Sequence, residues 1–268
     1  MNNLLTVVSL TKNNPKQLLK TLNSMRNFKK LIGNSKILII NGSINNFSEE
    51  YEEIYMDFKS KYNLLFVNCY EKGIYISMNK AISITSSEFI LFMNSGDVFS
   101  NEFDEKILID NLNYYKGKKN IKLLYCRTKI KSIINPNINY YNPPKYIGSK
   151  QKRFLPYLVP PSHQACFFRT SWHKKNTYKV DIGYRADRYL IKKSLNSSIY
   201  INTTSSIFFL DGISSLNLDI KSNIRNTLKT KSIRLILVNF IKIIARFIFK
   251  KNWEYIRYFK NLIFSIIP

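Results

Sequence analysis

An aspartate at the end of a buried strand is the first group in the sequence whose setting suggests chemistry. Residues 89–93 (FILFM) form a continuous apolar run of strand length, typical of a strand buried on both faces. The run ends at residues 94–97 (NSGD), all of them turn-favouring residues. Ligands of open α/β sheets bind beyond the carboxyl ends of the strands, so Asp97 would lie where a metal-bound phosphate is held. The alternative is a turn-forming aspartate without chemistry.

Two stretches around this strand resemble the family-2 glycosyltransferases of bacterial polysaccharide, O-antigen and capsule synthesis. In that family a segment like GIYDAMNKG precedes a strand that is followed by N-[AS]-G-D. Residues 73–81 here read GIYISMNKA, and Ile76 stands where the family usually has Asp. The resemblance covers residues 4–215. It implies a GT-A fold, an α/β Rossmann-like mixed sheet that binds a nucleotide-diphosphate sugar.

A second match lies at residues 160–169, which read PPSHQACFFR where family members commonly carry HQ-A-x-FF-R. His163 follows a rigid Pro-Pro and precedes an apolar strand, so we expect it at a strand edge. An imidazole there can contact the metal, the diphosphate or the acceptor, and a purely structural histidine is the alternative. The other histidine, His173, lies in a polar, Lys-rich stretch and is expected to be exposed.

A third match lies at residues 184–190 (YRADRYL), where many relatives have A-D-Y-D-F-L at the start of a helix. Asp187 fits the first carboxylate of that motif, which reaches the acceptor sugar, whereas Tyr189 replaces the second acid. An aspartate in the first turn of a helix is often present only for the helix dipole, and that alternative stays open. Residues 207–214 resemble the family's closing F-x-x-G-G-V-S, which places Gly212 over the donor diphosphate.

Hydrophobic periodicity predicts the elements that position these groups. Residues 4–10 form a strand, Pro15 begins a helix, and residues 36–40 form a second strand, which together make a parallel βαβ unit. Further helices are expected at residues 49–62 and 102–112, and strands at residues 64–68 and 123–126. A hairpin or loop excursion is expected over residues 129–141. Met78, Ala81 and Ile82 are expected to face the core from a short helix.

The resemblance also supplies a set of site residues. Asn41 stands where the family has an Asp that binds the nucleotide base, although a plain Asn-Gly turn explains it equally well. Asn79 and Lys80 would point towards the phosphates. The expected donor-binding residues are Ser9, Thr11, Asn41, Gly73, Asn79, Lys80, Asn94, Ser95, Gly96 and Asp97. His163, Gln164 and Gly212 are expected at the acceptor or diphosphate. Asp97 is expected to hold Mg²⁺ or Mn²⁺, with His163 as a second candidate ligand, and Asp187 is the expected catalytic base.

The charge of the chain, +25 over 268 residues, predicts a polyanionic partner. From residue 221 onward there are eleven Lys and Arg against one acid, Glu254. Residues 231–250 place basic residues on one helical face and Ile and Phe on the other, which favours an interfacial helix on anionic lipid. A helix docked on the core is the alternative. No run of eighteen uncharged apolar residues occurs, and the first residues look like a strand instead of a signal peptide.

These observations lead to one expected organisation. We expect a catalytic domain over residues 1–220, with a nucleotide-binding half (1–100) and an acceptor-binding half (101–220), and a basic tail over residues 221–268. Cys69, Cys126 and Cys166 show no metal or redox spacing and suit a reducing compartment. We therefore expect a cytoplasmic protein on the inner face of the cell membrane.

The expected activity is inverting transfer of a sugar from a nucleotide-diphosphate donor to a saccharide acceptor carried on a polyprenyl diphosphate. Two alternatives remain. One is an inactive relative that binds only nucleotide, because Asn41, Ile76 and Tyr189 each replace an expected Asp. The other is a basic nucleic-acid-binding protein, although no nucleic-acid module is recognisable in the sequence.

Overall fold

The computed structural model describes residues 4–43, 49–132, 137, 139–144, 156–157 and 159–210. The predicted tail over residues 221–268 and the expected closing glycine, Gly212, lie outside the described residues. The strands are β1 (Leu5–Thr11), β2 (Ser35–Asn41), β3 (Leu64–Asn68), β4 (Phe89–Phe92), β5 (Val98–Phe99), β6 (Leu123–Lys131), β7 (Asn139–Asn142), β8 (Cys166–Arg169) and β9 (Ser198–Phe209). The α-helices are α1 (Pro15–Met25), α2 (Lys29–Gly33), α3 (Glu49–Lys59), α4 (Ile74–Ile84), α5 (Glu105–Tyr115), α7 (Thr170–Lys175) and α8 (Ala186–Ser194). Three 3₁₀ helices are η1 (His163–Ala165), η2 (Val180–Arg185) and η3 (Leu195–Ser197).

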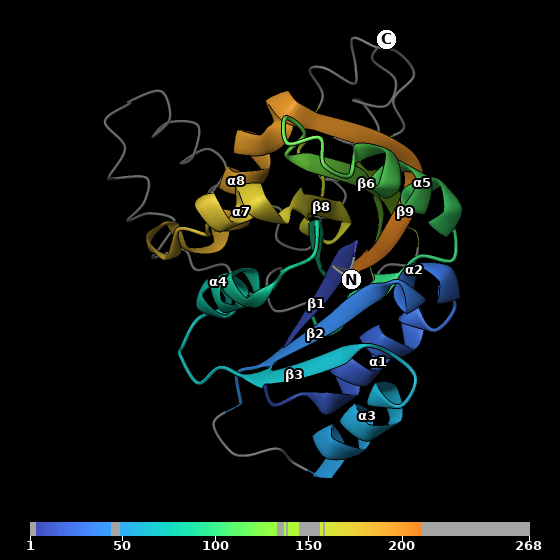
Figure 1. The fold of residues 1–268 in the computed structure, drawn as a ribbon, viewed down its shortest axis with the longest axis vertical. Coiled ribbons are helices and arrows are strands. Elements are labelled where there is room, and N and C mark those ends of the chain that lie inside the picture. Colours follow the sequence, from blue (N-terminus) through green and yellow to red (C-terminus); the bar gives the residue numbers. More distant parts are fainter. Residues whose placement is uncertain are drawn as a thin grey trace.

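Within the described residues the strands form one sheet in the order β3-β2-β1-β4-β8-β6-β9-β5, with β7 paired to β6 (Figure 1). The first four of these strands are parallel, which confirms the predicted βαβ unit. β8 enters antiparallel between β4 and β6, so the sheet is mixed. The carboxyl ends of β1, β2, β3 and β4 therefore share one edge, and the amino end of β8 lies at that same edge.

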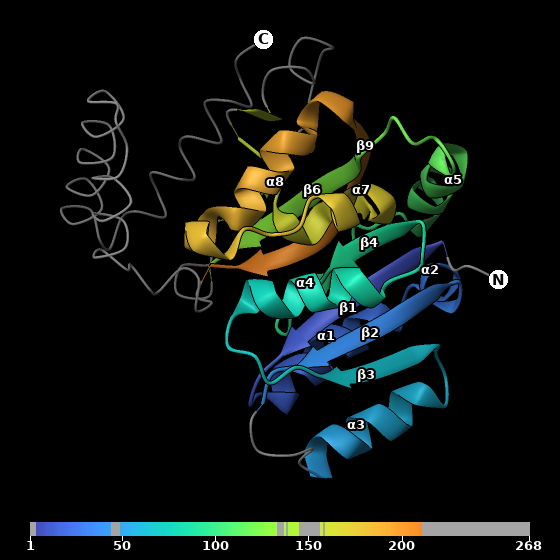
Figure 2. The ribbon, with the colours of Figure 1, turned by 60° about the vertical axis from the view of Figure 1, so that its left-hand side comes forward.

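Two apolar layers cover the two faces of the sheet. Val7 faces the layer built by α1, α2, α3 and α5, and its neighbour Val8 faces the layer built by α4 and α8. This alternation follows from the period-two geometry of a strand. Met78, Ala81 and Ile82 of α4 are buried, as the sequence predicts. Figure 2 shows α4, α7 and α8 together on one side of the sheet.

Local sequence explains where α1 and α4 begin. Pro15 lies in the first turn of α1, and the Asn14 side chain accepts a hydrogen bond from the Gln17 N–H, which satisfies one of the free amides of the helix start. Gly73 precedes α4 with a φ of 137°, a backbone conformation that side-chain-bearing residues rarely adopt. These two signals fix the first residues of α1, which follows β1, and of α4, which follows β3.

Several element boundaries differ from the sequence predictions. β6 runs to Lys131 and pairs with β7 in an antiparallel register, which confirms the expected hairpin over residues 129–141. α3 ends at Lys59, three residues earlier than predicted, and α5 begins at Glu105, three residues later than predicted. Helix ends depend on capping contacts more than on periodicity. Asp104 supplies such a cap by accepting from the Ile107 N–H. The twelve-residue strand β9 lies where no strand was predicted from the sequence.

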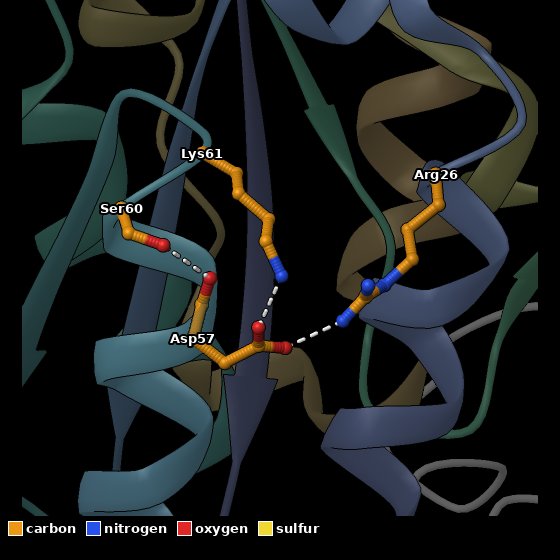
Figure 3. A network of polar contacts seen from close by, with 4 residues as sticks. All are labelled: Arg26, Asp57, Ser60 and Lys61. Atoms are coloured by element: carbon orange, nitrogen blue, oxygen red, sulfur yellow. Dashed lines mark hydrogen bonds and ion pairs between the residues drawn. The ribbon is translucent and has the colours of Figure 1, made fainter.

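A polar network joins the end of α1 to α3 (Figure 3). The carboxylate of Asp57 pairs with Arg26 and Lys61, and the Ser60 hydroxyl donates to the Asp57 backbone carbonyl. The cations lower the pKa of Asp57. All three charged side chains are more than a third exposed, so solvent screening leaves this network little weight in the stability of the fold.

Among the described residues, no helix combines the length and the apolar character that crossing a bilayer requires. All three cysteines are free thiols buried in the protein, and Cys126 and Cys166 lie in opposite apolar layers of the sheet. One sheet passes through both predicted halves of the catalytic domain, and their division near residue 100 stays a prediction.

Candidate functional site

The turn after β4 fixes Asp97 at the carboxyl edge of the parallel strands. Asp97 is 8% exposed, and its carboxylate accepts hydrogen bonds from the Asn94 N–H (3.2 Å) and from the Gln164 side-chain amide (3.1 Å). Gly96 has a φ of 100°, and its N–H donates to the Thr21 hydroxyl at 2.9 Å. A side chain at position 96 would also approach within 2.9 Å of the Gln17 amide oxygen. The turn is therefore held against α1 by hydrogen bonds, and only glycine suits position 96.

The surroundings of Asp97 contain little positive charge. Burial raises the pKa of Asp97 to about 7, while Gln164, Asn94 and the charge of Lys20 act in the opposite direction. Next to it, the side-chain oxygens of Asn94 and Ser95 are buried without a hydrogen-bond partner among the described residues. Native proteins rarely leave such atoms unsatisfied except where a ligand, ion or water completes them. This turn therefore has the features of a binding site for a polar ligand.

Asp187 lies in the first turn of α8, as predicted. The Arg188 N–H donates to its carboxylate at 2.6 Å. Burial raises the pKa of Asp187, and the Arg188 N–H, the Arg188 charge and Tyr75 partly offset that rise. A carboxylate with a raised pKa accepts a proton more readily near neutral pH, as a general base must.

Helix η1 and the start of β8 bring the two carboxylates to one region. Gln164 of η1 donates to Asp97. Helix α8, which carries Asp187 in its first turn, packs against η1, and η1 packs against β4. The elements that carry Asp97 and Asp187, which are ninety residues apart in the sequence, therefore meet at η1.

His163 lies in an aromatic cluster beside this segment. Its ring stacks on Phe92 with centroids 5.3 Å apart, and its Nε2 is 2.5 Å from the Tyr178 hydroxyl. Burial lowers the pKa of His163 to about 4, so the ring is neutral at pH 7. Because Nε2 bonds a phenol and the ring lies among aromatic side chains, the geometry does not support His163 as a metal ligand. It supports the structural alternative.

The expectation that His173 is exposed is wrong. Its side chain is fully buried, with its ring 4.7 Å from that of Phe168 and its Nε2 3.3 Å from the Tyr178 hydroxyl. The lysines that made its surroundings look polar, Lys174 and Lys175, are exposed on the short helix α7, whereas His173 faces inward. A six-residue helix is too short to reveal its buried face by periodicity.

The buried state of His173 predicts an acid-sensitive contribution to stability. Burial lowers its pKa from 6.5 to about 4, so between these values the unfolded chain binds a proton that the folded chain does not. The free energy of unfolding must then fall as the pH falls through this window. Between pH 7 and pH 5 we expect wild type to lose about 2 kcal/mol more than His173→Phe, because one pKa unit corresponds to about 1.36 kcal/mol.

Urea denaturation of both proteins at a series of pH values measures this difference. The comparison cancels the contributions of Asp97 and Asp187, whose raised pKa values act with the opposite sign. Parallel curves for the two proteins would contradict the burial of a neutral His173.

Three expected donor-binding side chains are used inside the fold. The Ser9 hydroxyl donates to the Met93 carbonyl at 2.7 Å, and the Thr11 hydroxyl bonds the Tyr51 hydroxyl at 2.8 Å. Asn41 is 1% exposed, donates to the Asn68 side chain, and accepts from the Ser43 N–H at 3.1 Å. These bonds join β1 to the residue after β4 and to α3, and β2 to β3, so the prediction that these three side chains contact the donor is not supported.

Helix α4 presents a similar correction. The Asn79 amide donates to the Tyr178 carbonyl at 3.0 Å and accepts from the Tyr178 N–H at 2.8 Å, so Asn79 holds the loop after α7 and does not face a phosphate. Lys80 is exposed on α4, and its contact with the donor stays a prediction. Gly73 is explained by its backbone conformation at the start of the helix.

Two residues that the sequence did not single out take part in the region. Tyr75 stacks on Tyr178 with ring centroids 5.3 Å apart, and the matched motif GIYISMNKA already contained it, but the motif gave no reason to separate it from its neighbours. Tyr178 lies between His163 and His173, and no local pattern points to it. Only the fold brings these side chains together.

Comparisons with known proteins agree with this geometry. Residues 6–175, more than half of the chain, match the family described as "Glycosyl transferase family 2". No curated protein matches the sequence. Residues 1–349 of S. aureus TarS, solved in complex with UDP, share 16% identity and a TM-score of 0.56 over 89% of this chain. The same TarS fragment in complex with UDP-GlcNAc has a TM-score of 0.57 at 16% identity, covering 87% of this chain and 68% of that one.

A mannosyltransferase from Pyrobaculum calidifontis, solved with GDP-Man and Mn²⁺, has 10% identity and a TM-score of 0.55 over 91% of this chain. The chain spans 65% of that protein and 65% of the UDP-bound TarS fragment, just under two thirds of each. At these identities the likeness concerns the fold, and it confirms the predicted GT-A architecture. Together with the family match over residues 6–175, it shows that the chain belongs to glycosyl transferase family 2.

Proposed function

We propose that this chain is an inverting glycosyltransferase of the hexosyltransferase type, which moves a sugar from a nucleotide-diphosphate donor to a saccharide acceptor. The observation that carries the proposal is the position of η1 between the two carboxylate-bearing elements: Gln164 of η1 bonds Asp97, and α8, which begins with Asp187, packs against η1. One carboxylate lies at the strand edge where nucleotide ligands of α/β sheets bind, and the other lies at the start of a helix across that segment. Membership of family 2 supports the reaction class.

In this proposal Asp187 takes the proton of the acceptor hydroxyl. The hydroxyl oxygen forms its bond to the anomeric carbon while the bond from that carbon to the diphosphate oxygen breaks, and the nucleoside diphosphate leaves. A single displacement inverts the anomeric centre, so an α-linked donor of a D-sugar gives a β-glycoside. The raised pKa of Asp187 suits a general base that works near neutral pH.

The residues around Asp97 fit a divalent cation. Among the described residues there is no cluster of three or more His, Cys, Asp or Glu that would form an all-protein metal cage. Mg²⁺ does not need such a cage, because it is usually held by one or two carboxylates together with substrate phosphates. Asp97 is a buried carboxylate flanked by the unpartnered oxygens of Asn94 and Ser95. We propose that Asp97 holds Mg²⁺ or Mn²⁺, which when bound neutralises charge on the leaving diphosphate.

The donor is proposed to be a nucleotide-diphosphate sugar. Two structures of similar fold hold UDP-GlcNAc and GDP-Man, which supports this class without selecting a base or a sugar. Gln164 would steady Asp97, and Asn94, Ser95 and Gly96 would border the diphosphate. Lys20 adds a cation near Asp97, and its ammonium lies 4.2 Å from the Phe209 ring centroid at the end of β9.

A thermal-shift screen tests the donor proposal directly. Full-length protein is heated with UDP, GDP or CDP, each with and without Mn²⁺, and the corresponding sugar nucleotides follow. We expect one nucleotide diphosphate to raise the Tm, and to do so more strongly with Mn²⁺, because only the folded chain binds it. No shift with any nucleotide would overturn the proposed function.

The acceptor is proposed to be a saccharide on a polyprenyl diphosphate, used in surface polysaccharide synthesis at the inner face of the cell membrane. The support is the sequence of residues 221–268, with eleven basic residues against one acid, and with basic residues on one helical face of residues 231–250 and Ile and Phe on the other. We expect deletion of residues 229–268 to release the protein from liposomes that contain anionic lipid. Co-sedimentation of full-length and shortened chains measures the loss, and equal binding of both would contradict a membrane role for this segment.

A second candidate is a relative that binds nucleotide without turning it over. Asn41, Ile76 and Tyr189 replace three acids that the family usually has, and Asn41 is buried and occupied by its neighbours. Nucleotide binding together with no transfer to any acceptor would favour this candidate. Transfer of even one sugar would exclude it.

A further inference from the structure

The helices on the two faces of the sheet differ strongly in charge. Helices α1, α2, α3 and α5, which cover one face, contain six lysines against seven acidic residues. Helices α4, α7 and α8, which lie together on the other face, contain six basic residues and a single acid, Asp187 (Figure 2). The six basic residues are all exposed: Lys80, Lys174, Lys175, Arg188, Lys192 and Lys193. We call the outer surface of α4, α7 and α8 the basic face.

No acidic side chain in the described part of the protein neutralises this charge. The four ion pairs found there join other side chains, and none includes a lysine of the basic face. The segment between α7 and α8 adds one exposed lysine, Lys179, and one exposed acid, Asp181. The excess of positive charge is therefore available to attract an anionic surface.

Exposed apolar side chains lie among these charges. Three of them are between 42% and 50% exposed: Ile74 of α4, Val180 of η2 and Tyr189 of α8. The ring centroid of Tyr189 lies 5.3 Å from the Lys179 ammonium, so α8 contacts the segment that carries Val180. The Asn79 side chain on α4 bonds both the N–H and the carbonyl of Tyr178 in the same segment. These contacts join the three helices into one surface on which basic and apolar side chains alternate.

We propose that the basic face lies against a membrane whose lipids carry anionic headgroups, with Ile74, Val180 and Tyr189 at the headgroup level. Basic side chains beside exposed apolar and aromatic ones are the combination that such a surface binds. A nucleic acid fits less well, because the aliphatic side chains of Ile74 and Val180 offer no ring on which a base can stack. The inference rests on the proposed function in one respect. Asp187 begins a helix of the basic face, so an acceptor carried on a membrane lipid would approach the proposed base from the membrane side.

The basic face and the proposed membrane segment, residues 229–268, would act as two attachments on one chain. Two weak attachments bind far more strongly together than either does alone, because the second one binds at a high effective concentration. Loss of either attachment should therefore release much of the protein. The test accordingly uses the full-length chain.

The first experiment reverses four charges of the basic face. The variant combines Lys174→Glu, Lys175→Glu, Lys192→Glu and Lys193→Glu. The matched control makes the same change in net charge at four exposed lysines of α1, α2 and α5, and combines Lys16→Glu, Lys29→Glu, Lys30→Glu and Lys106→Glu. Co-sedimentation with vesicles made of equal parts of phosphatidylglycerol and phosphatidylcholine measures binding.

We expect the basic-face variant to bind these vesicles about a hundredfold more weakly than wild type, because each basic residue near an anionic surface strengthens binding by up to about fivefold. The control should stay within about threefold of wild type, since its lysines would face away from the membrane. Vesicles of phosphatidylcholine alone should bind all three proteins weakly. Equally strong binding of wild type to both kinds of vesicle would contradict an electrostatic contact.

A second measurement locates the contact on the surface. The three native cysteines are buried, so a fluorophore that responds to the polarity of its surroundings can be attached to an introduced, exposed cysteine. One variant is Val180→Cys on the basic face, and its control is Met56→Cys on α3, where the native side chain is 61% exposed. We expect the anionic vesicles to shift the emission to shorter wavelength in Val180→Cys and to leave Met56→Cys unchanged.

Equal loss of vesicle binding in the two charge variants, or the same emission shift at positions 180 and 56, would overturn the inference. Binding of single-stranded RNA that only the basic-face variant loses, while its vesicle binding is unchanged, would assign the face to a nucleic acid and overturn it as well. The proposed function fails differently, because then no nucleotide diphosphate raises the Tm of wild type. Both charge variants should keep that Tm shift, since none of their eight lysines lies in the proposed site.

Discussion

Replacement of Asp187 by asparagine should lower kcat for sugar transfer by about 10²- to 10⁴-fold, the usual contribution of a general base. Asparagine has the shape of aspartate, and its carbonyl oxygen can still accept from the Arg188 N–H. The fold and the helix start should therefore survive. What the amide lacks is the ability to take the proton of the acceptor hydroxyl at neutral pH.

The matched control is Asp181→Asn, six residues earlier. Asp181 is an exposed acid in η2 that takes no part in the proposed site, so its replacement should leave kcat within twofold of wild type. The measurement is release of nucleoside diphosphate and formation of glycoside with a donor chosen by the thermal-shift screen. Asp187→Asn should still bind that nucleotide as wild type does. Full activity in Asp187→Asn would remove Asp187 from the mechanism.

Asp97→Asn should behave differently from Asp187→Asn. Loss of the Asp97 carboxylate removes the proposed cation ligand, so the additional Tm shift that Mn²⁺ gives with nucleotide should disappear. The two variants therefore separate donor binding from proton transfer. If both variants lost only nucleotide binding, the proposed division of roles between the two carboxylates would be wrong.

Hydrophobic patterning was enough to predict the strands that carry the site. The run at residues 89–93, the parallel β1–α1–β2 unit and the short helix after Gly73 all have strong periodic or turn signals, and the structure contains them. Two of the motifs also come together in the fold, where Gln164 bonds Asp97 and α8 packs against η1, while the roles of these residues stay predictions. A buried strand and the turn that ends it are local features, which explains why local sequence reveals them.

The individual roles of polar side chains could not be predicted in the same way. Ser9, Asn41 and Asn79 lie at positions that favour ligand contact, yet each is bonded to a neighbouring strand or loop. A polar side chain at a strand end can bind a ligand or tie the sheet together, and the two outcomes have the same local sequence. The choice depends on partners such as Met93 and Tyr178, which only the tertiary fold supplies.

Arg169 shows that one matched motif can contain a residue of the proposed site and a residue that stabilises the sheet, at opposite ends of β8. The matched stretch PPSHQACFFR begins at the proposed site, where Gln164 bonds Asp97, but its last residue lies at the opposite edge of the sheet. There Arg169 pairs with the first residue of β4, Phe89, and its side chain is 1% exposed. The arginine is therefore placed to hold the sheet together, remote from the chemistry.

Replacement of Arg169 by methionine should lower the free energy of unfolding by about 2–4 kcal/mol, because it removes three hydrogen bonds of a buried guanidinium, each worth about 1 kcal/mol. The Nε of Arg169 donates to the Ile121 carbonyl at 2.6 Å, and its second terminal nitrogen donates to the Tyr115 carbonyl at 2.7 Å. The remaining nitrogen pairs with Glu88, whose side chain is 31% exposed. Methionine would fill the space but leave the Ile121 carbonyl without its side-chain donor and Glu88 without its cation. The Tyr115 carbonyl and the Glu88 carboxylate would keep the Lys118 and Gly117 N–H groups as donors.

Urea denaturation of Arg169→Met, Arg169→Lys and Arg26→Met separates the contributions. Lysine keeps the charge near Glu88 but lacks the planar fork that reaches two carbonyls, so Arg169→Lys should fall between wild type and Arg169→Met. Arg26→Met removes a guanidinium from the exposed network of Figure 3 and should cost far less than Arg169→Met. Because Arg169 lies at the edge away from Asp97 and Asp187, the folded fraction of Arg169→Lys should transfer sugar at the wild-type rate. Equal losses of stability in Arg169→Met and Arg26→Met would show that the buried contacts of Arg169 do not support the sheet.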